Sequence, residues 1–176
     1  MRKAVLVVDM IEEFVTGRLG DPRMLSVIEP SKRLLARARE AGVPVLYARD
    51  CHRPGDPELE IWGEHAMEGS DGCDFVEGLE PLEGEPVFEK SVYSAFYGTG
   101  MDEYLDQLEV DTLVLVGQLT DVCVRHTAAD AFYRGYRTQV PSDCVQALDD
   151  AQHERALQEM MALYGTFILP SQEVSF

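Results

Sequence analysis

The sequence predicts an α/β protein of three layers, in which helices cover both faces of a parallel six-stranded sheet. Apolar runs rich in β-branched residues alternate with segments of helical period, which is typical of βαβ units. Most of these runs are continuously apolar, as expected of strands buried on both faces. The chain has 176 residues, 45% of them hydrophobic and 27% charged, which suits one domain with its own core. We therefore expect a single domain over residues 1–176.

The elements follow from these patterns. The six predicted strands are Ala4–Asp9, Val43–Arg49, Pro86–Lys90, Thr112–Gly117, Arg137–Ser142 and Gly165–Leu169. The four predicted helices, whose apolar residues recur every three or four positions, are Glu29–Ala41, Met101–Leu108, Cys123–Tyr133 and Asp150–Tyr164. Glycines follow the first and third of these helices, in the position that commonly ends a helix.

One segment, residues 50–85, fits neither pattern. It has no sustained periodicity and contains three prolines and the only tryptophan. An insertion of about 35 residues without regular structure is uncommon in a compact domain and is more often functional than not. We expect this insertion to contribute to a site.

The composition excludes several classes of partner. The chain carries 32 acidic and 15 basic residues, a net charge of −17, so its surface repels nucleic acid and anionic lipid. No apolar run reaches the roughly 18 residues that span a bilayer, and the N-terminus lacks the features of a signal peptide. We expect a cytoplasmic protein whose four cysteines are free thiols.

Polar side chains follow the predicted strands at their carboxyl ends, where parallel sheets bind ligands. They include Asp9, Asp50, Lys90 and, after the fourth strand, Cys123. Cys123 opens a predicted helix, where the helix dipole and a nearby lysine favour the thiolate. A neighbouring carboxylate could accept the thiol proton and return it to a leaving amine. The residues indicate an acyl-transfer site, although a buried structural cysteine is an equal alternative from spacing alone.

Three separated motifs make the sequence recognisable. Val7-Val8-Asp9-Met10, the segment Glu89–Phe96 and the segment Val116–Val124 occur in the order found in the isochorismatase-like cysteine hydrolases, which include the nicotinamidases. The chain resembles this superfamily from its first strand to its last helix. The resemblance implies a catalytic triad of Asp9, Lys90 and Cys123. It also implies an oxyanion hole made by the backbone amides of Leu119 and Cys123, and a cis peptide bond between Gln118 and Leu119.

The insertion resembles the nicotinamidase branch in particular. The resemblance implies that Asp50, His52 and His65 hold a divalent metal ion. This donor set suits Zn²⁺, with Fe²⁺ or Mn²⁺ as alternatives. The branch also places aromatic side chains around the substrate ring. By this resemblance Phe14 and Trp62 are expected to line the substrate site. Tyr93 and Phe96 are also candidates for this site, with a contact between subunits as an equal alternative.

The chain departs from that branch in places that bear on the substrate. Where the branch often has a further histidine, this chain reads Gly55-Asp56-Pro57-Glu58, so Asp56, Glu58 or water could complete the metal site. The segment Ile11-Glu12-Glu13 also departs from the branch, and Val122 stands where nicotinamidases often have histidine or tyrosine. These changes leave the triad intact and the substrate open.

The resemblance implies hydrolysis of a small amide through a thioester on Cys123, with nicotinamide as the favoured substrate. One alternative keeps the triad and changes the substrate to an N-carbamoyl or ureido compound. Another is a non-catalytic binding protein on the same fold, because a fold does not determine a function. The resemblance further implies a homo-oligomer, either a dimer or a tetramer.

Overall fold

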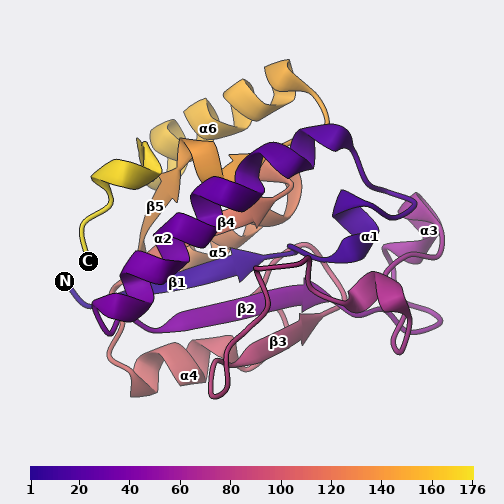
Figure 1. Cartoon of the computed structure of the whole chain (residues 1–176), viewed down its shortest axis with the longest axis horizontal. Helices are drawn as coiled ribbons and strands as arrows, with labels where there is room; N and C mark the ends of the chain where they lie inside the picture. Colours follow the sequence, from indigo (N-terminus) through magenta and orange to yellow (C-terminus); the bar gives the residue numbers. More distant parts are fainter.

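The fold is built on one sheet in which every strand pair is parallel. The structure, a computed structural model, describes residues 1–176 (Figure 1). Its strands are β1 (Lys3–Val8), β2 (Val45–Asp50), β3 (Val87–Lys90), β4 (Thr112–Gln118), β5 (Arg137–Pro141), β6 (Val145–Gln146) and β7 (Phe167–Leu169). They lie in the order β3-β2-β1-β4-β5-β7, and β6 pairs with the end of β4.

Helices cover both faces of this sheet. They are α1 (Glu12–Val15), α2 (Ile28–Glu40), α3 (Leu59–Trp62), α4 (Met101–Gln107), α5 (Arg125–Tyr133) and α6 (Asp150–Tyr164). Short 3₁₀ turns span Pro22–Val27, Asp71–Cys73, Ser142–Cys144 and Ser171–Glu173, and a π-helical turn, Thr120–Val124, leads from β4 into α5. None of the helices is both long and apolar enough to cross a membrane.

Alternate residues of the strands feed two hydrophobic cores, one on each face. In β1, Leu6 and Val8 belong to the core under α4, α5 and α6, whereas Val5 and Val7 belong to the core under α2. All four are fully buried. The continuous apolar run of β1 is therefore the direct result of burial on both sides.

The structure corrects the predicted sheet from six strands to seven. The additional strand, β6, has only two residues and extends the sheet beyond the reach of β5, opposite Gly117 and Gln118. So short a strand has no detectable period in a sequence. The same holds for α1 and α3, which have four residues each.

The insertion lies against the carboxyl ends of β1 and β2, together with α1 (Figure 1). An isolated bridge between Phe75 and Ile11 ties it to the segment that follows β1, and a second bridge, between His52 and Met67, lies within the insertion. A small core of Ile11, Ala66 and Cys73 is buried beneath it. The insertion is thereby held over the ends of the strands, where the polar side chains lie.

A close approach of β1 and β4 sets the geometry at this edge. Gly117 pairs with Val8 and has φ +119°, a conformation open to glycine and rarely to other residues. A Cβ atom at Gly117 would lie 1.9 Å from the Val8 carbonyl oxygen. Only glycine therefore lets the two strands end side by side.

Candidate active site

The structure brings the three predicted catalytic residues together. Asp9 follows β1, Lys90 ends β3, and Cys123 lies in the π-helical turn after β4. The Lys90 ammonium Nζ is 2.8 Å from Asp9 Oδ2 and 3.6 Å from Cys123 Sγ. The acceptor atoms of Asp9, Asp50 and Cys123 all lie within 4.8 Å of one another. Residues 114 positions apart in the chain thus share one buried centre.

Asp9 is held in an unusual backbone conformation. Its φ is +52°, in the left-handed region that residues other than glycine rarely adopt. Its N–H donates to the Ala48 carbonyl at 2.9 Å, and its Oδ1 accepts the Asp50 N–H at 2.8 Å. Both bonds anchor Asp9 to β2, which leaves Oδ2 to face Lys90.

Burial and charge set the protonation of this centre. Burial, reinforced by the charge of Asp50 and opposed by Lys90, raises the pKa of Asp9 to about 6. Burial disfavours the charged form of Lys90, but the negative charges of Asp50 and Asp9 outweigh it and raise the lysine pKa well above its ordinary value. At neutral pH the centre therefore holds an ammonium ion between two carboxylates.

The thiol of Cys123 differs from the sequence-based expectation of a favoured thiolate. Burial raises the pKa of Cys123 well above its ordinary value, even though the Lys90 charge lowers it. The side chain is buried among carboxylates, and desolvation outweighs a single cation. The resting residue is therefore a thiol, and the Asp9 carboxylate lies within 4.8 Å of its sulfur, where it could accept the proton.

Four side chains form a second cluster beside the first. One donor atom from each of Asp50, His52, Glu58 and His65 lies within 4.8 Å of the others, and all four residues are buried. Asp50 belongs to both clusters, because its Oδ1 accepts from Lys90 at 2.5 Å while its Oδ2 lies 3.7 Å from His52 Nε2. From the sequence, Glu58 was only one of three expected ways to complete the site.

The donor atoms of this cluster fit a divalent metal ion. His52 Nε2 and Glu58 Oε1 are buried and have no hydrogen-bond partner in the protein. His52 Nδ1 donates to the Asp56 carboxylate at 3.3 Å, and His65 Nδ1 donates to the Gly63 carbonyl at 2.7 Å, so both imidazoles keep Nε2 free to bind. Two imidazoles and two carboxylates match the ligand set and number of a zinc site.

Burial also shifts the acidity of this cluster. It raises the pKa of Glu58 to about 8, with the Asp50 charge adding to the effect. Burial lowers the pKa of His65. Buried carboxylates at this spacing repel one another, and a bound cation would relieve that repulsion.

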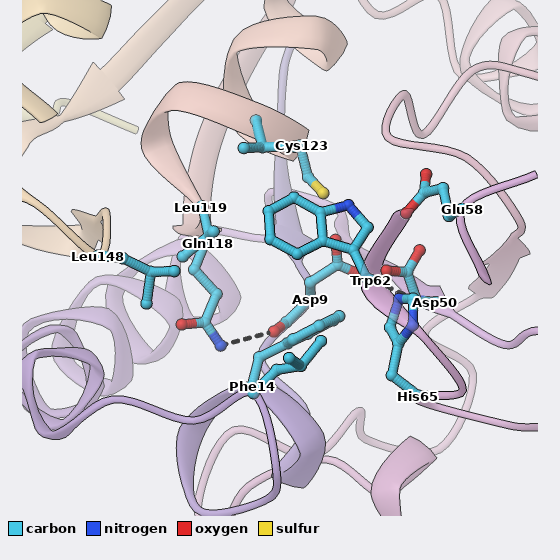
Figure 2. Close-up of a pocket in the computed structure, with 12 residues that line it drawn as sticks. Asp9, Phe14, Asp50, Glu58, Trp62, His65, Gln118, Leu119, Cys123 and Leu148 are labelled. Atoms are coloured by element: carbon cyan, nitrogen blue, oxygen red, sulfur yellow. Dashed lines mark hydrogen bonds between the residues drawn. The ribbon is translucent and has the colours of Figure 1, made fainter. Parts of the chain in front are cut away.

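The two clusters open into one cavity. Twelve residues line it: Asp9, Phe14, Leu19, Asp50, Glu58, Trp62, His65, Gln118, Leu119, Val122, Cys123 and Leu148. Figure 2 shows Asp50, Glu58 and His65 on one side and Leu119 and Leu148 on the opposite side, with Cys123 and Asp9 between them. Leu19, Gln118 and Leu148 were not predicted, because they come from irregular segments or from inside a buried strand.

The structure places the predicted aromatic residues in different environments. Phe14 and Trp62 line the cavity. Tyr93 does not line it, but its hydroxyl accepts the Trp62 indole N–H at 3.1 Å and its ring contacts His126. Phe96 is only 4% exposed and stacks on Tyr136 in the core under α4 and α5, so its expected place in the substrate site is corrected. The sequence spacing could not separate these two rings.

The loop before Cys123 carries backbone donors. The peptide bond between Gln118 and Leu119 is cis, as the resemblance implied. The Leu119 N–H makes no hydrogen bond within the protein, whereas the Leu119 carbonyl accepts from Val122 and Val124. Thr120 in this loop is tied to α6 by a 2.9 Å hydrogen bond with His153 Nδ1.

Comparison with known proteins agrees with this geometry. The isochorismatase domain family matches residues 3–172. N-carbamoylsarcosine amidase from Thermoplasma acidophilum is 41% identical, with a TM-score of 0.94 over 100% of both chains. The pyrazinamidase/nicotinamidase of Streptococcus mutans is 31% identical, with a TM-score of 0.88 over 95% of this chain and 99% of the other. The pyrazinamidase of Pyrococcus horikoshii, solved in complex with zinc, is 27% identical, with a TM-score of 0.89 over 97% of this chain and 99% of the other.

These matches span almost the whole chain and include enzymes named as amidases. They leave the individual substrate open, because the similar proteins bear the names of different amides. The chain belongs to the isochorismatase family, and it is a hydrolase that acts on carbon–nitrogen bonds outside peptides.

Proposed function

We propose that the protein hydrolyses nicotinamide to nicotinate and ammonia through a thioester on Cys123. The observation that carries this proposal is the cluster of Asp50, His52, Glu58 and His65, of which all but His52 line the cavity that holds the Cys123 sulfur. A metal ion there would bind the pyridine nitrogen and orient the carboxamide. Phe14 and Trp62 offer aromatic surfaces for the ring of the substrate.

The reaction would proceed in two steps, of which acylation is the first. Asp9 takes the proton of the Cys123 thiol, and the sulfur attacks the carboxamide carbon. The backbone amides of Leu119 and Cys123 stabilise the negative oxygen that develops. The carbon–nitrogen bond then breaks as Asp9 gives the proton to the departing nitrogen, which leaves as ammonia.

Water completes the cycle in the second step. Asp9 takes a proton from a water molecule, whose oxygen attacks the thioester carbon. The carbon–sulfur bond breaks, the proton returns to the sulfur, and nicotinic acid is released. Lys90 stays protonated throughout and stabilises the charges of Asp9 and the thiolate, since it lies within 3.6 Å of both.

The metal that we propose is Zn²⁺, because it favours four ligands of nitrogen and oxygen. The pyrazinamidase of Pyrococcus horikoshii, which resembles this chain, was solved with zinc. Fe²⁺ and Mn²⁺ accept the same ligands. Elemental analysis of the purified protein, followed by reconstitution with each ion, identifies the metal that supports turnover.

A second candidate substrate is an N-carbamoyl compound. It is favoured by the 41% identity to an N-carbamoylsarcosine amidase. A substrate of that kind carries a carboxylate, which calls for a cationic partner. No arginine or lysine lines the cavity, and Lys90 is already paired with two aspartates. The lining therefore favours an uncharged amide.

Ammonia release from a panel of amides tests the proposal. The panel holds nicotinamide, pyrazinamide, N-carbamoylsarcosine and maleamate, each with and without a chelator. We expect nicotinamide to be turned over fastest, chelation to abolish that turnover, and Cys123→Ala to be inactive. Faster release from N-carbamoylsarcosine that survives chelation would replace the first candidate with the second, and full activity of Cys123→Ala would refute the thioester.

We also propose that the protein assembles as a dimer or tetramer. Phe132 near the end of α5, Leu163 near the end of α6 and Phe167 at the start of β7 are exposed, and a second subunit would cover such apolar side chains. Sedimentation of the purified protein measures the number of subunits. A monomer at micromolar concentration would contradict this assembly.

A further inference from the structure

We propose that Gln118 is a positioning residue that holds Asp9 in its catalytic orientation. Gln118 ends β4 and is fully buried. Its side-chain Nε2 donates a 3.0 Å hydrogen bond to the backbone carbonyl of Asp9, 109 residues away in the chain (Figure 2). Neither the family's triad nor its oxyanion hole includes this contact.

The contact supplies a partner that the sheet cannot supply. The pairing of β1 with β4 ends at Val8 and Gly117, one residue before Asp9 and Gln118. The Asp9 carbonyl receives no backbone N–H, although the residue is fully buried. A buried carbonyl without a partner is unfavourable, so the Gln118 amide takes the place of the missing backbone donor.

The direction of this bond is fixed by chemistry. A carbonyl oxygen only accepts hydrogen bonds, so the amide must present its NH₂ group to Asp9. The other end of the amide, Oε1, has no partner in the protein. The only hydrogen bond of the Gln118 side chain is therefore the one to Asp9.

The bond acts on the residue whose orientation matters most. Asp9 has φ +52°, so its peptide groups do not continue the extended path of β1. Its N–H is held by β2 and its carbonyl by Gln118, and these two bonds fix the peptide on both sides of the Cα atom. Loss of the second bond would let the carboxylate move relative to Cys123, where small displacements cost large factors in rate.

Two substitutions separate this role from simple packing. Gln118→Met has similar length and volume but no donor. Gln118→Glu donates only while its carboxyl is protonated, and burial raises the pKa of such a carboxyl above its ordinary value. Gln146 provides the matched control: it is the register partner of Gln118 on β6, and its side chain bonds only the neighbouring Ala147 N–H.

The first readout is the rate at which iodoacetamide alkylates Cys123, followed by mass spectrometry; the second is kcat and KM for nicotinamide. We expect Gln118→Met to lower the alkylation rate and kcat by about 10- to 100-fold with KM changed less than about threefold. The rate of Gln118→Glu relative to wild type should be near one at acidic pH and should fall as the pH rises. Gln146→Met and Gln146→Glu should match wild type at every pH.

Two results would overturn the inference: alkylation and kcat of Gln118→Met within twofold of wild type, or a ratio for Gln118→Glu that stays constant from pH 5 to 9. The second comparison is made within one variant and so remains decisive even if Gln118→Met does not fold. The inference rests on the proposed function only in taking Asp9 as the base. Asp9→Asn distinguishes the failure of the proposed function from the failure of this inference. Unchanged alkylation of Cys123 in Asp9→Asn would refute Asp9 as the base. Slowed alkylation in Asp9→Asn together with normal alkylation in Gln118→Met would refute only the role of Gln118.

Discussion

The two halves of the site are built in different ways. Asp9 and Lys90 stand at the ends of paired strands, and Cys123 stands in the turn that follows the end of β4, so the sheet sets the position of all three. Glu58 and His65 stand in an insertion held by one isolated bridge to Ile11 and by a small core that it shares with that residue. Asp50, at the end of β2, belongs to both halves.

We infer from this difference that the strand ends carry the reaction and that the insertion selects the substrate. The strand ends are fixed by many backbone hydrogen bonds, which suits proton transfers that tolerate little movement. The insertion has fewer constraints and can vary in length and composition, which suits the choice of substrate. Changes at the strand ends should therefore lower kcat for every amide, and changes in the insertion should alter metal and substrate binding.

Asp9→Asn is expected to give the largest effect of the carboxylate variants. It keeps the shape of Asp9 and removes the base, so kcat should fall by about 10³-fold or more for all amides tested, within the range for loss of general acid–base catalysis. Steady-state ammonia release measures this. Asp74→Asn, an exposed change in the insertion, is the control and should leave kcat unchanged. A fall in kcat for nicotinamide alone would contradict the separation of the reaction from the choice of substrate.

Substitutions in the metal cluster should produce a graded loss of metal affinity. We expect Glu58→Gln to weaken Zn²⁺ binding by about 100-fold, because it removes a ligand. Asp56→Asn should weaken it by about 10-fold, because Asp56 only orients His52. Titration calorimetry measures both, with the exposed Glu60→Gln of α3 as the control. Equal losses of Zn²⁺ affinity in Glu58→Gln and Glu60→Gln would show that Glu58 is not a ligand.

The pH dependence of kcat/KM should report the strand-end half. Asp9 must be ionised to accept the thiol proton, and burial raises its pKa to about 6. Activity should therefore fall by about tenfold per pH unit below 6 and level off above it. A profile at saturating metal measures this limb. An activity that stays flat down to pH 4.5 would contradict a buried base.

Tyr93→Phe should give the smallest effect. It removes the hydroxyl that accepts from the Trp62 indole and keeps the ring against His126. We expect KM for nicotinamide to rise by about fivefold with kcat unchanged, since one uncharged hydrogen bond is worth about 1 kcal/mol. Phe96→Leu, a change in the core, should alter thermal stability and not KM. A changed KM with unchanged thermal stability in Phe96→Leu would instead indicate that Phe96 belongs to the substrate site.

The sequence predicted the strand-end half almost completely. Asp9 and Lys90 each end a predicted strand and Cys123 follows one, and parallel strands bring their carboxyl ends to one edge. The helices at 101–108 and 150–164 were also predicted within one residue, because their apolar residues keep a strict helical period. Local pattern and tertiary structure agree in these regions.

The insertion could be predicted only in part, because its structure depends on contacts with distant segments. Glu58 stands in the cluster while Asp56 lies behind His52, and no spacing in the sequence distinguishes them. The raised pKa of the Cys123 thiol was also missed, because burial depends on everything that surrounds the sulfur. The role of Gln118 could not be predicted, since the residue ends a buried strand and nothing in the sequence shows which group its amide contacts.

The missing side chain at Gly117 bears on how this enzyme can be altered. Because a methyl group there would collide with the Val8 carbonyl, the position controls the spacing between the strand that precedes Asp9 and the strand that precedes Cys123. Phe14, Leu19 and Leu148 lie outside that contact, so the walls of the cavity can be redesigned to accept other amides while the reacting groups keep their separation. Substitutions that alter substrate preference should therefore be made in the cavity walls, and glycine should be kept at position 117.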